Sequence, residues 1–133
     1  MSYLVIGSNS FSGSNFVKYL IDLGNIVYGV SRSPEPNPVF LPYKSNNKKE
    51  IQNFEFKEIN LNHDLDKLMH FIYEKKPKYI INFAAQGMVA ESWNDPLHWY
   101  KTNLISQVAF HNELKNCKYL KKYLHVTTPE VYG

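Results

Sequence analysis

The alternation of short apolar runs with segments of helical periodicity constrains the fold of this chain more than any other feature. Five runs have the length and composition of strands: residues 3–6, 26–30, 54–59, 79–85 and 123–127. Between these runs, apolar residues recur at spacings of three and four, as at Val17 and Leu20 or at Leu104 and Val108. Parallel strands need crossover connections, and helices are the compact ones. The order therefore predicts an α/β fold built on a parallel sheet.

The composition excludes several other classes of protein. A chain of 133 residues with 44% hydrophobic and 15% aromatic residues can bury a core. The net charge of +3 is too small to argue for a nucleic-acid partner, and no apolar run is long enough to span a membrane. Cys117 is the only cysteine, which suits a reducing cytoplasm, and the five histidines lack the compact spacing of metal ligands. We expect one cytoplasmic domain with no metal, no nucleic-acid partner and no membrane partner.

Residues 7–13 read GSNSFSG and connect the first expected strand to the first expected helix. In this context the first glycine permits a tight turn and the last lets the helix pack closely on the strand. The amides at the helix start then face a pyrophosphate group. Ser10 stands where a middle glycine would let the backbone approach phosphate, but its hydroxyl is small and is itself able to donate. The alternative is a turn rich in glycine and serine that binds no ligand.

The end of the second strand bears on the choice of nucleotide. Sites that prefer NAD usually place an acidic residue there to hold the ribose hydroxyls. This chain has Ser31 and Arg32 instead. An arginine pairs with a 2′-phosphate and stacks on adenine, so we expect NADP first and NAD second. The alternative is a solvated surface arginine.

Three further segments follow in order along the chain. They are Asn60-Leu61, the run INFAAQGMVAESW at residues 81–93, and the run TTPEVYG at residues 127–133. Together with the glycine turn, these segments resemble the extended short-chain dehydrogenase/reductase family in its nucleotide-sugar epimerase/dehydratase branch. Asn60 stands where the family usually has an aspartate, and TTPEVYG is similar to the family's S-[ST]-x-x-V-Y-G turn. The resemblance covers the whole chain but only the N-terminal part of the family.

The resemblance implies a Rossmann-like α/β fold, with a parallel sheet of order about 3-2-1-4-5 and helices on both faces. It also implies a nucleotide-linked sugar as substrate and a homodimer in the full-length form. The implied cofactor-binding residues are Gly7, Ser10, Phe11, Ser12, Gly13, Ser31, Arg32, Asn60, Leu61, Phe83, Ala84, Ala85, Asn103 and Thr127. The implied substrate-binding residues are Gln86, Gly87, Met88 and Thr128.

The same resemblance implies two catalytic residues near the end of the sequence. Thr128 matches the catalytic hydroxyl, which exchanges a hydrogen bond with the sugar oxygen as that oxygen loses its proton. Glu130 matches the glutamate that removes a ring proton in the dehydratases of this branch. Pro129 occupies the position of their acid and has no side-chain proton to give. A conventional 4,6-dehydratase is therefore in doubt, whereas epimerases and reductases do not need that acid.

The family also uses a Tyr-x-x-x-Lys pair, in which tyrosinate takes the sugar hydroxyl proton. No tyrosine of this chain is followed four positions later by a lysine. We therefore expect residues 1–133 to be an NAD(P)-binding domain that stops before that pair and before the substrate-binding region. A full-length parent would be an enzyme, and the 133 residues alone would be inactive. The alternatives are a catalytically silent dinucleotide-binding or regulatory module and a non-sugar reductase of the same superfamily.

Overall fold

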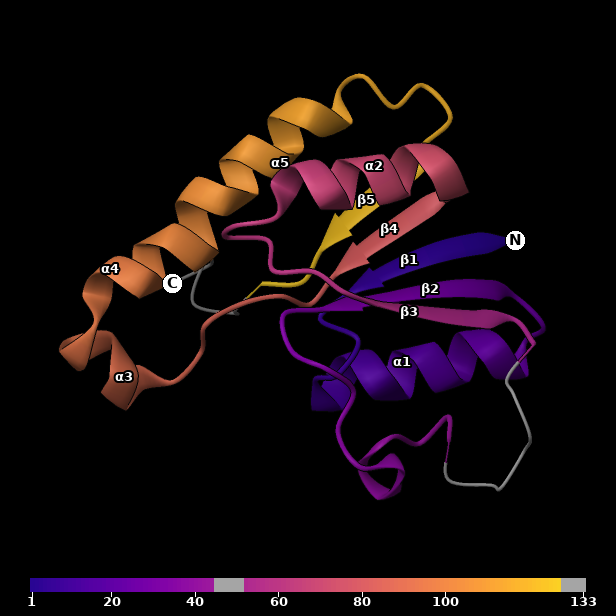
Figure 1. Ribbon diagram of the computed structural model, residues 1–133, viewed down its shortest axis with the longest axis horizontal. Helices are drawn as coiled ribbons and strands as arrows, with labels where there is room; N and C mark the ends of the chain where they lie inside the picture. The colour runs from indigo at the N-terminus through magenta and orange to yellow at the C-terminus, as the bar shows by residue number, and fades with distance from the viewer. Residues whose placement is uncertain (45–51, 128–133) are drawn as a thin grey trace.

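A computed structural model describes residues 1–44 and 52–127 of the chain. Five parallel strands form one sheet in the order β3-β2-β1-β4-β5, which confirms the predicted topology (Figure 1). The strands are β1 (Ser2–Ile6), β2 (Ile26–Ser31), β3 (Phe54–Glu58), β4 (Tyr79–Asn82) and β5 (Lys122–His125). The strand order reverses between β1 and β4, and in such sheets the crevice at the carboxyl ends of these strands is where ligands bind.

Helices cover both faces of the sheet (Figure 1). Helix α1 (Phe11–Asp22) lies on one face, and helices α2 (Leu65–Lys75) and α5 (Ser106–Leu114) lie on the other. Side chains alternate along β1 accordingly. Val5 packs in a core with Val17 of α1, whereas Leu4 packs in a second core with Ile72 of α2 and Phe110 of α5.

The connection after β2 is the loop with one short element that its four prolines predict. Within its described residues, 32–44 and 52–53, it contains one 3-10 turn, η1 (Pro38–Phe40). Leu41 is fully buried and Tyr43 nearly so, and both join the core on the α1 side of the sheet. This connection is therefore packed against the domain at Leu41 and Tyr43, after the exposed residues that directly follow β2.

The long helix between β4 and β5 is present as predicted, but it buries a different face from the one that the sequence pattern predicts. A short helix α3 (Val89–Asn94) is followed by α4 (Pro96–Tyr100), a π-helical turn η2 (Lys101–Ile105) and α5. The apolar residues that predicted this helix, Leu97, Tyr100, Leu104 and Val108, are all exposed. Ser106, Gln107, Phe110 and Leu114 form the buried side instead. The polar members of that side make buried hydrogen bonds described below, which an apolar pattern does not reveal.

None of the helices in residues 1–44 and 52–127 combines the length and the apolar character that crossing a bilayer requires.

Candidate functional site

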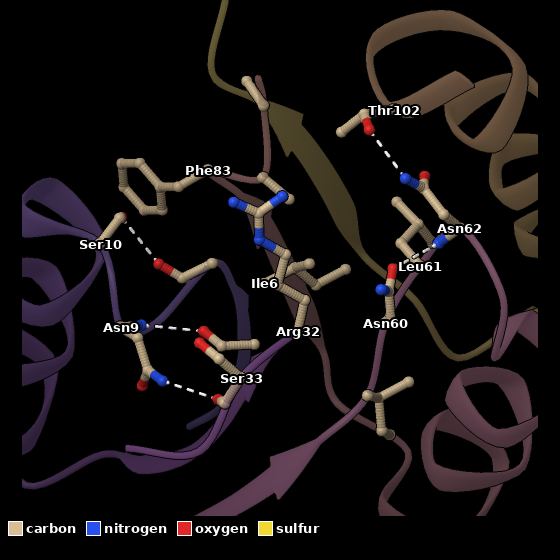
Figure 2. A pocket seen from close by; sticks show the side chains of 15 residues that line it. Ile6, Asn9, Ser10, Arg32, Ser33, Asn60, Leu61, Asn62, Phe83 and Thr102 are labelled. Carbon is tan, nitrogen blue, oxygen red and sulfur yellow. Dashed lines mark hydrogen bonds between the residues drawn. The ribbon is translucent and has the colours of Figure 1, made fainter. Parts of the chain in front are cut away.

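A pocket of about 280 Å³ lies at the carboxyl ends of four strands (Figure 2). Its lining comes from the ends of β1 and β2, from the turn after β3, from the segment after β4, and from Thr102 of η2. The lining residues are Ile6, Gly7, Asn9, Ser10, Ser31, Arg32, Ser33, Ile59, Asn60, Leu61, Asn62, Phe83, Ala84, Ala85 and Thr102. Arg32 is the one charged side chain in this set, and none is acidic. Such a lining favours an anionic ligand with an apolar part.

The two glycines of the turn occupy positions that other residues would strain. Gly7 has a φ of +81°, and a Cβ there would lie 3.0 Å from the amide nitrogen of Ala84. A Cβ on Gly13 would lie only 2.2 Å from the carbonyl oxygen of Gly7. The first glycine thus lets β1 turn against the segment after β4, and the last lets α1 pack on the turn, as the spacing predicts.

Ser10 is the N-cap of α1, and its hydroxyl is engaged inside the turn. The hydroxyl donates to the carbonyl oxygen of Gly7 at 2.7 Å and accepts the amide of Gly13 at 3.0 Å. The expectation that this hydroxyl donates to a phosphate is therefore wrong for this conformation, because its proton is already used. The amides of Phe11 and Ser12 have no hydrogen-bond partner among the described residues. Those two amides are what the helix start offers to an anion.

Arg32 extends its guanidinium over the pocket (Figure 2). The side chain is exposed and makes no ion pair or hydrogen bond with the residues that the structure describes. Ser31, in contrast, is 7% exposed, and its hydroxyl accepts the amide of Asn9 at 2.9 Å. The two predicted residues thus differ: Arg32 is free to meet a ligand, whereas Ser31 supports the glycine turn.

Asn9 and Ser33 line the pocket although the sequence reasoning missed them. The Asn9 amide nitrogen donates to the carbonyl oxygens of Ser33 and Pro34, each at 3.0 Å. The one available signal was the position of Asn9 inside the glycine turn, since asparagine amides often bond to nearby backbone. Its partners lie more than twenty residues further along the chain, so the sequence gives no sign of them.

Asn60 presents a donor to the pocket more readily than an acceptor. Its side-chain oxygen accepts the backbone amide of Asn62 at 3.0 Å, which also fixes which end of the amide is oxygen. Its amide nitrogen has no partner within the described ranges. Leu61 lines the pocket beside it, as expected for a residue next to adenine. The acceptor oxygen that the sequence reasoning assigned to Asn60 therefore already holds the turn.

Asn62 and Thr102 also line the pocket without having been predicted. The Asn62 amide donates to the Thr102 hydroxyl at 2.7 Å, and its oxygen accepts the Ser106 hydroxyl at 2.7 Å. This contact joins the turn after β3 to the helix that follows β4, and it places Thr102 at the rim.

The segment after β4 is held by a buried amide network. Asn82 is fully buried, and its oxygen accepts the Ala84 amide at 2.8 Å, which ends the strand earlier than predicted. Its amide donates to the Gln107 side-chain oxygen at 2.7 Å and to the Tyr123 hydroxyl at 2.9 Å. Gln107 in turn donates to the Ala84 carbonyl at 3.3 Å. Both backbone groups of Ala84 are thus fixed, and Phe83, Ala84 and Ala85 are held against the glycine turn.

The network continues from Tyr123 to His125. Burial raises the pKa of Tyr123 and lowers the pKa of His125, so both groups favour their neutral forms. The Tyr123 hydroxyl and Nδ1 of His125 share a hydrogen bond at 3.0 Å. The chain of contacts ties β5 to the end of β4.

Asn103 acts on the site indirectly. Its side-chain oxygen accepts the Gln86 amide at 2.8 Å, and its amide donates to the Gln86 carbonyl at 2.9 Å. Gln86 is buried, whereas Gly87 and Met88 are exposed beyond the pocket. Thr127 is exposed and does not line the pocket. Thr128 and Glu130 lie outside the described residues.

Comparison with known proteins identifies a matching family and three related proteins. A sequence profile of the GDP-mannose 4,6 dehydratase family matches residues 4–133. CDP-glucose 4,6-dehydratase of Salmonella typhimurium is 28% identical over 96% of this chain and 34% of its own length. UDP-glucose 4-epimerase of Thermotoga maritima, solved with UDP-glucose, is 26% identical, with a TM-score of 0.77 over 96% of this chain and 38% of its own. Bordetella bronchiseptica WbmF, solved with NAD+, is 26% identical, with a TM-score of 0.73 over 93% of this chain and 35% of its own.

The chain spans only 34% to 39% of the length of the curated relatives that it matches, and the match lies in their N-terminal part. The profile match covers nearly the whole chain, and the sheet order is the one that the resemblance implied. The chain belongs to the GDP-mannose 4,6 dehydratase family, within the nucleotide-sugar epimerase/dehydratase branch of the extended short-chain dehydrogenases/reductases.

Proposed function

We propose that this chain is the dinucleotide-binding part of an NAD(P)-dependent enzyme that transforms a nucleotide-linked sugar. The observation that carries the proposal is the pocket at the switch between β1 and β4. It contains an arginine, and lies beside amides of α1, that have no partner among residues 1–44 and 52–127. A related protein, WbmF, is solved with NAD+, and the related Thermotoga epimerase is solved with UDP-glucose. These relatives support a nicotinamide dinucleotide as cofactor and a sugar nucleotide as substrate.

In this proposal the amides of Phe11 and Ser12 bind the pyrophosphate, and the glycines bring it close to the helix. Asn60 and Leu61 border the adenine. The cofactor passes along the Phe83–Ala85 segment, whose backbone is fixed by the Asn82 network. The role of Asn103 is to hold the Gln86 backbone where the chain turns toward the sugar.

The sugar would lie beyond Gln86, Gly87 and Met88, and Thr127 would mark the cofactor side of the following turn. Thr128 and Glu130 are proposed as the hydroxyl and the carboxylate that act on the sugar. A bound nicotinamide would supply the hydride acceptor for oxidation at the sugar's C4, and epimerisation, dehydration or reduction would follow that oxidation. In a full-length parent we propose a homodimer.

Arg32 leads us to propose NADP as the preferred cofactor, with NAD second. The lining of the pocket has no carboxylate to hold two ribose hydroxyls, and the free guanidinium suits a 2′-phosphate. Hydrogen bonds to a charged group are worth about 1.5–3 kcal/mol, which corresponds to a preference of roughly 10- to 100-fold.

The first test compares the dissociation constants of NADP+ and NAD+ by isothermal titration calorimetry. Arg32→Asp is expected to reverse the preference, because it removes the phosphate partner and adds a carboxylate for the ribose. Lys121→Asp is the matched control, since it makes the same change of charge just before the amino end of β5, away from the pocket. A preference that survives Arg32→Asp would show that the arginine does not read the phosphate.

The second test concerns turnover. The 133 residues contain no Tyr-x-x-x-Lys sequence, so we expect dinucleotide binding without catalysis. Incubation with NADP+ or NAD+ and a panel of nucleotide sugars should produce no reduced nicotinamide and no altered sugar. Rapid turnover would contradict this assignment, whereas binding alone is also what a silent dinucleotide-binding module would show. Sequencing the reading frame that contains residues 1–133 distinguishes the enzyme from the silent module. A Tyr-x-x-x-Lys sequence downstream favours the enzyme.

A further inference from the structure

Asn9 joins the glycine turn to the chain on both sides of Arg32 (Figure 2). Its backbone amide donates to the hydroxyl of Ser31, the residue before the arginine, at 2.9 Å. Its side-chain amide donates to the carbonyl oxygens of Ser33 and Pro34, the two residues after it, at 3.0 Å each. One residue of the turn thus holds the backbone that carries the free arginine.

The backbone on the two sides of Arg32 has different support. Ser31 ends β2 and is fixed by the sheet, since it pairs with Glu58 and its carbonyl accepts the amide of Ile59 at 2.9 Å. The sheet ladder stops there. Beyond Arg32, the carbonyls of Ser33 and Pro34 accept hydrogen bonds from Asn9 and from no other group among the described residues. The path of the chain immediately after the arginine therefore depends on the Asn9 side chain.

The orientation of the Asn9 amide is fixed by these two acceptors. Two carbonyl oxygens require two donated hydrogens, so the nitrogen and not the oxygen must face them. The Asn9 oxygen is then buried, and no described residue gives it a hydrogen-bond partner. Buried polar atoms without partners are uncommon, which sets this amide apart from an ordinary surface asparagine. An aspartate here would place an oxygen against both carbonyls and could not replace it.

We propose that Asn9 is a positioning residue that sets the dinucleotide preference of the pocket by aiming Arg32 at the 2′-phosphate. It acts through the arginine and does not contact the phosphate. The guanidinium has no partner of its own in the described structure, so the backbone that Asn9 holds sets the position and direction from which the Arg32 side chain reaches toward the pocket. This inference rests on the proposed function, because it assumes that the pocket binds a nicotinamide dinucleotide.

A double-mutant cycle tests the inference. The dissociation constants of NADP+ and NAD+ are measured by calorimetry for the wild type, Asn9→Ala, Arg32→Ala and the double variant. Asn9→Ala keeps the backbone bond to Ser31 and removes only the two side-chain bonds. We expect it to reduce the preference for NADP+ by about three- to tenfold, close to the effect of one or two hydrogen bonds, with little change in NAD+ binding. In the Arg32→Ala background the same substitution should leave the ratio of the two constants unchanged.

Asn37→Ala is the matched control, because Asn37 caps η1 in the same connection and its side chain bonds to Val39 and, among the described residues, to none of residues 31–34. It should leave the ratio at its wild-type value. Asn9→Ser serves as a second variant should the alanine protein not fold, since its shorter side chain cannot reach both carbonyls. Circular dichroism and thermal unfolding verify that each variant is folded.

The possible results distinguish a failure of the proposed function from a failure of the inference about Asn9. A wild type that binds neither dinucleotide overturns the proposed function and, with it, this inference. A wild type that binds both equally overturns the role of Arg32 and of Asn9. A wild type that prefers NADP+, together with an Asn9→Ala variant of undiminished preference, overturns this inference alone and leaves the proposed function standing. An effect of Asn9→Ala that persists without Arg32 would show that Asn9 acts by another route.

Discussion

Ser10 occupies the middle position of the glycine turn and serves the protein as a helix cap. Its hydroxyl bonds to Gly7 and Gly13, so the turn gains stability where the family pattern has a glycine. The same bond occupies the Gly13 amide, which would otherwise face the ligand. Ser10 therefore stabilises the turn but leaves one fewer backbone amide free to bind an anion.

Two substitutions at Ser10 separate these effects. Ser10→Ala is expected to lower the free energy of unfolding by about 1 kcal/mol, and Ser10→Gly by only a few tenths, because glycine is itself an acceptable N-cap. Ser10→Gly also frees the Gly13 amide and should tighten dinucleotide binding by roughly two- to fivefold, the worth of one modest hydrogen bond. Urea denaturation and calorimetry measure the two quantities. Weaker binding in Ser10→Gly would mean that the serine hydroxyl contacts the ligand.

Residue-level prediction from the sequence succeeded where geometry is local. The spacing of Gly7 and Gly13 identified two positions of the turn at which a Cβ would be crowded, because the turn itself creates the crowding. Asn9, Asn62 and Thr102 were missed, because the hydrogen bonds that join them to other segments at the pocket span between 22 and 44 residues of sequence. No local pattern encodes such partners, and only the assembled sheet brings them together.

The helix formed by α4, η2 and α5 shows how far periodicity reaches at the level of an element. The spacing of its apolar residues predicted a helix, and a helix is present. The face was not predictable, because Gln107 is buried through its bonds to Asn82 and Ala84, and Ser106 through its bond to Asn62. On this helix, polar side chains with buried hydrogen-bond partners face the core. Its apolar residues therefore form an exposed stripe on the opposite side.

The exposed stripe and the sheet edge together predict self-association of this chain. Leu104 and Val108 are 54% and 59% exposed, and within the described residues β5 pairs only with β4. Exposed apolar surface and open strand edges both promote contacts between copies. We expect light scattering to show a mass above that of the monomer at high protein concentration, and the Leu104→Lys/Val108→Lys variant to show less association.

Val39→Lys/Phe40→Lys is the control for that experiment, since it adds the same charge to two exposed apolar residues of η1. It should associate as the wild type does. A wild type that is monomeric at every concentration would contradict the prediction.

At the scale of the whole molecule, the alternation of strands and helices was enough to predict a parallel sheet, and the family resemblance implied its order. The physical reason is that crossover connections have one preferred hand, so few arrangements are open to a chain of this pattern. The position of the pocket follows from the same topology, since it lies where the strand order reverses. What the topology does not determine is the polar network that shapes the pocket, and we propose that the preference between NADP and NAD depends on that network.

The central claim is that the pocket between the glycine turn and the segment after β4 binds a nicotinamide dinucleotide. Amide nitrogen–proton correlation spectra of the isotope-labelled chain, recorded while NADP+ is added, test it most directly. We predict that the largest shifts fall on residues 7–13, 31–33, 60–62 and 83–85, with the amides of Phe11 and Ser12 among them. An unchanged spectrum, or shifts confined to helices α3 and α4, would contradict the account.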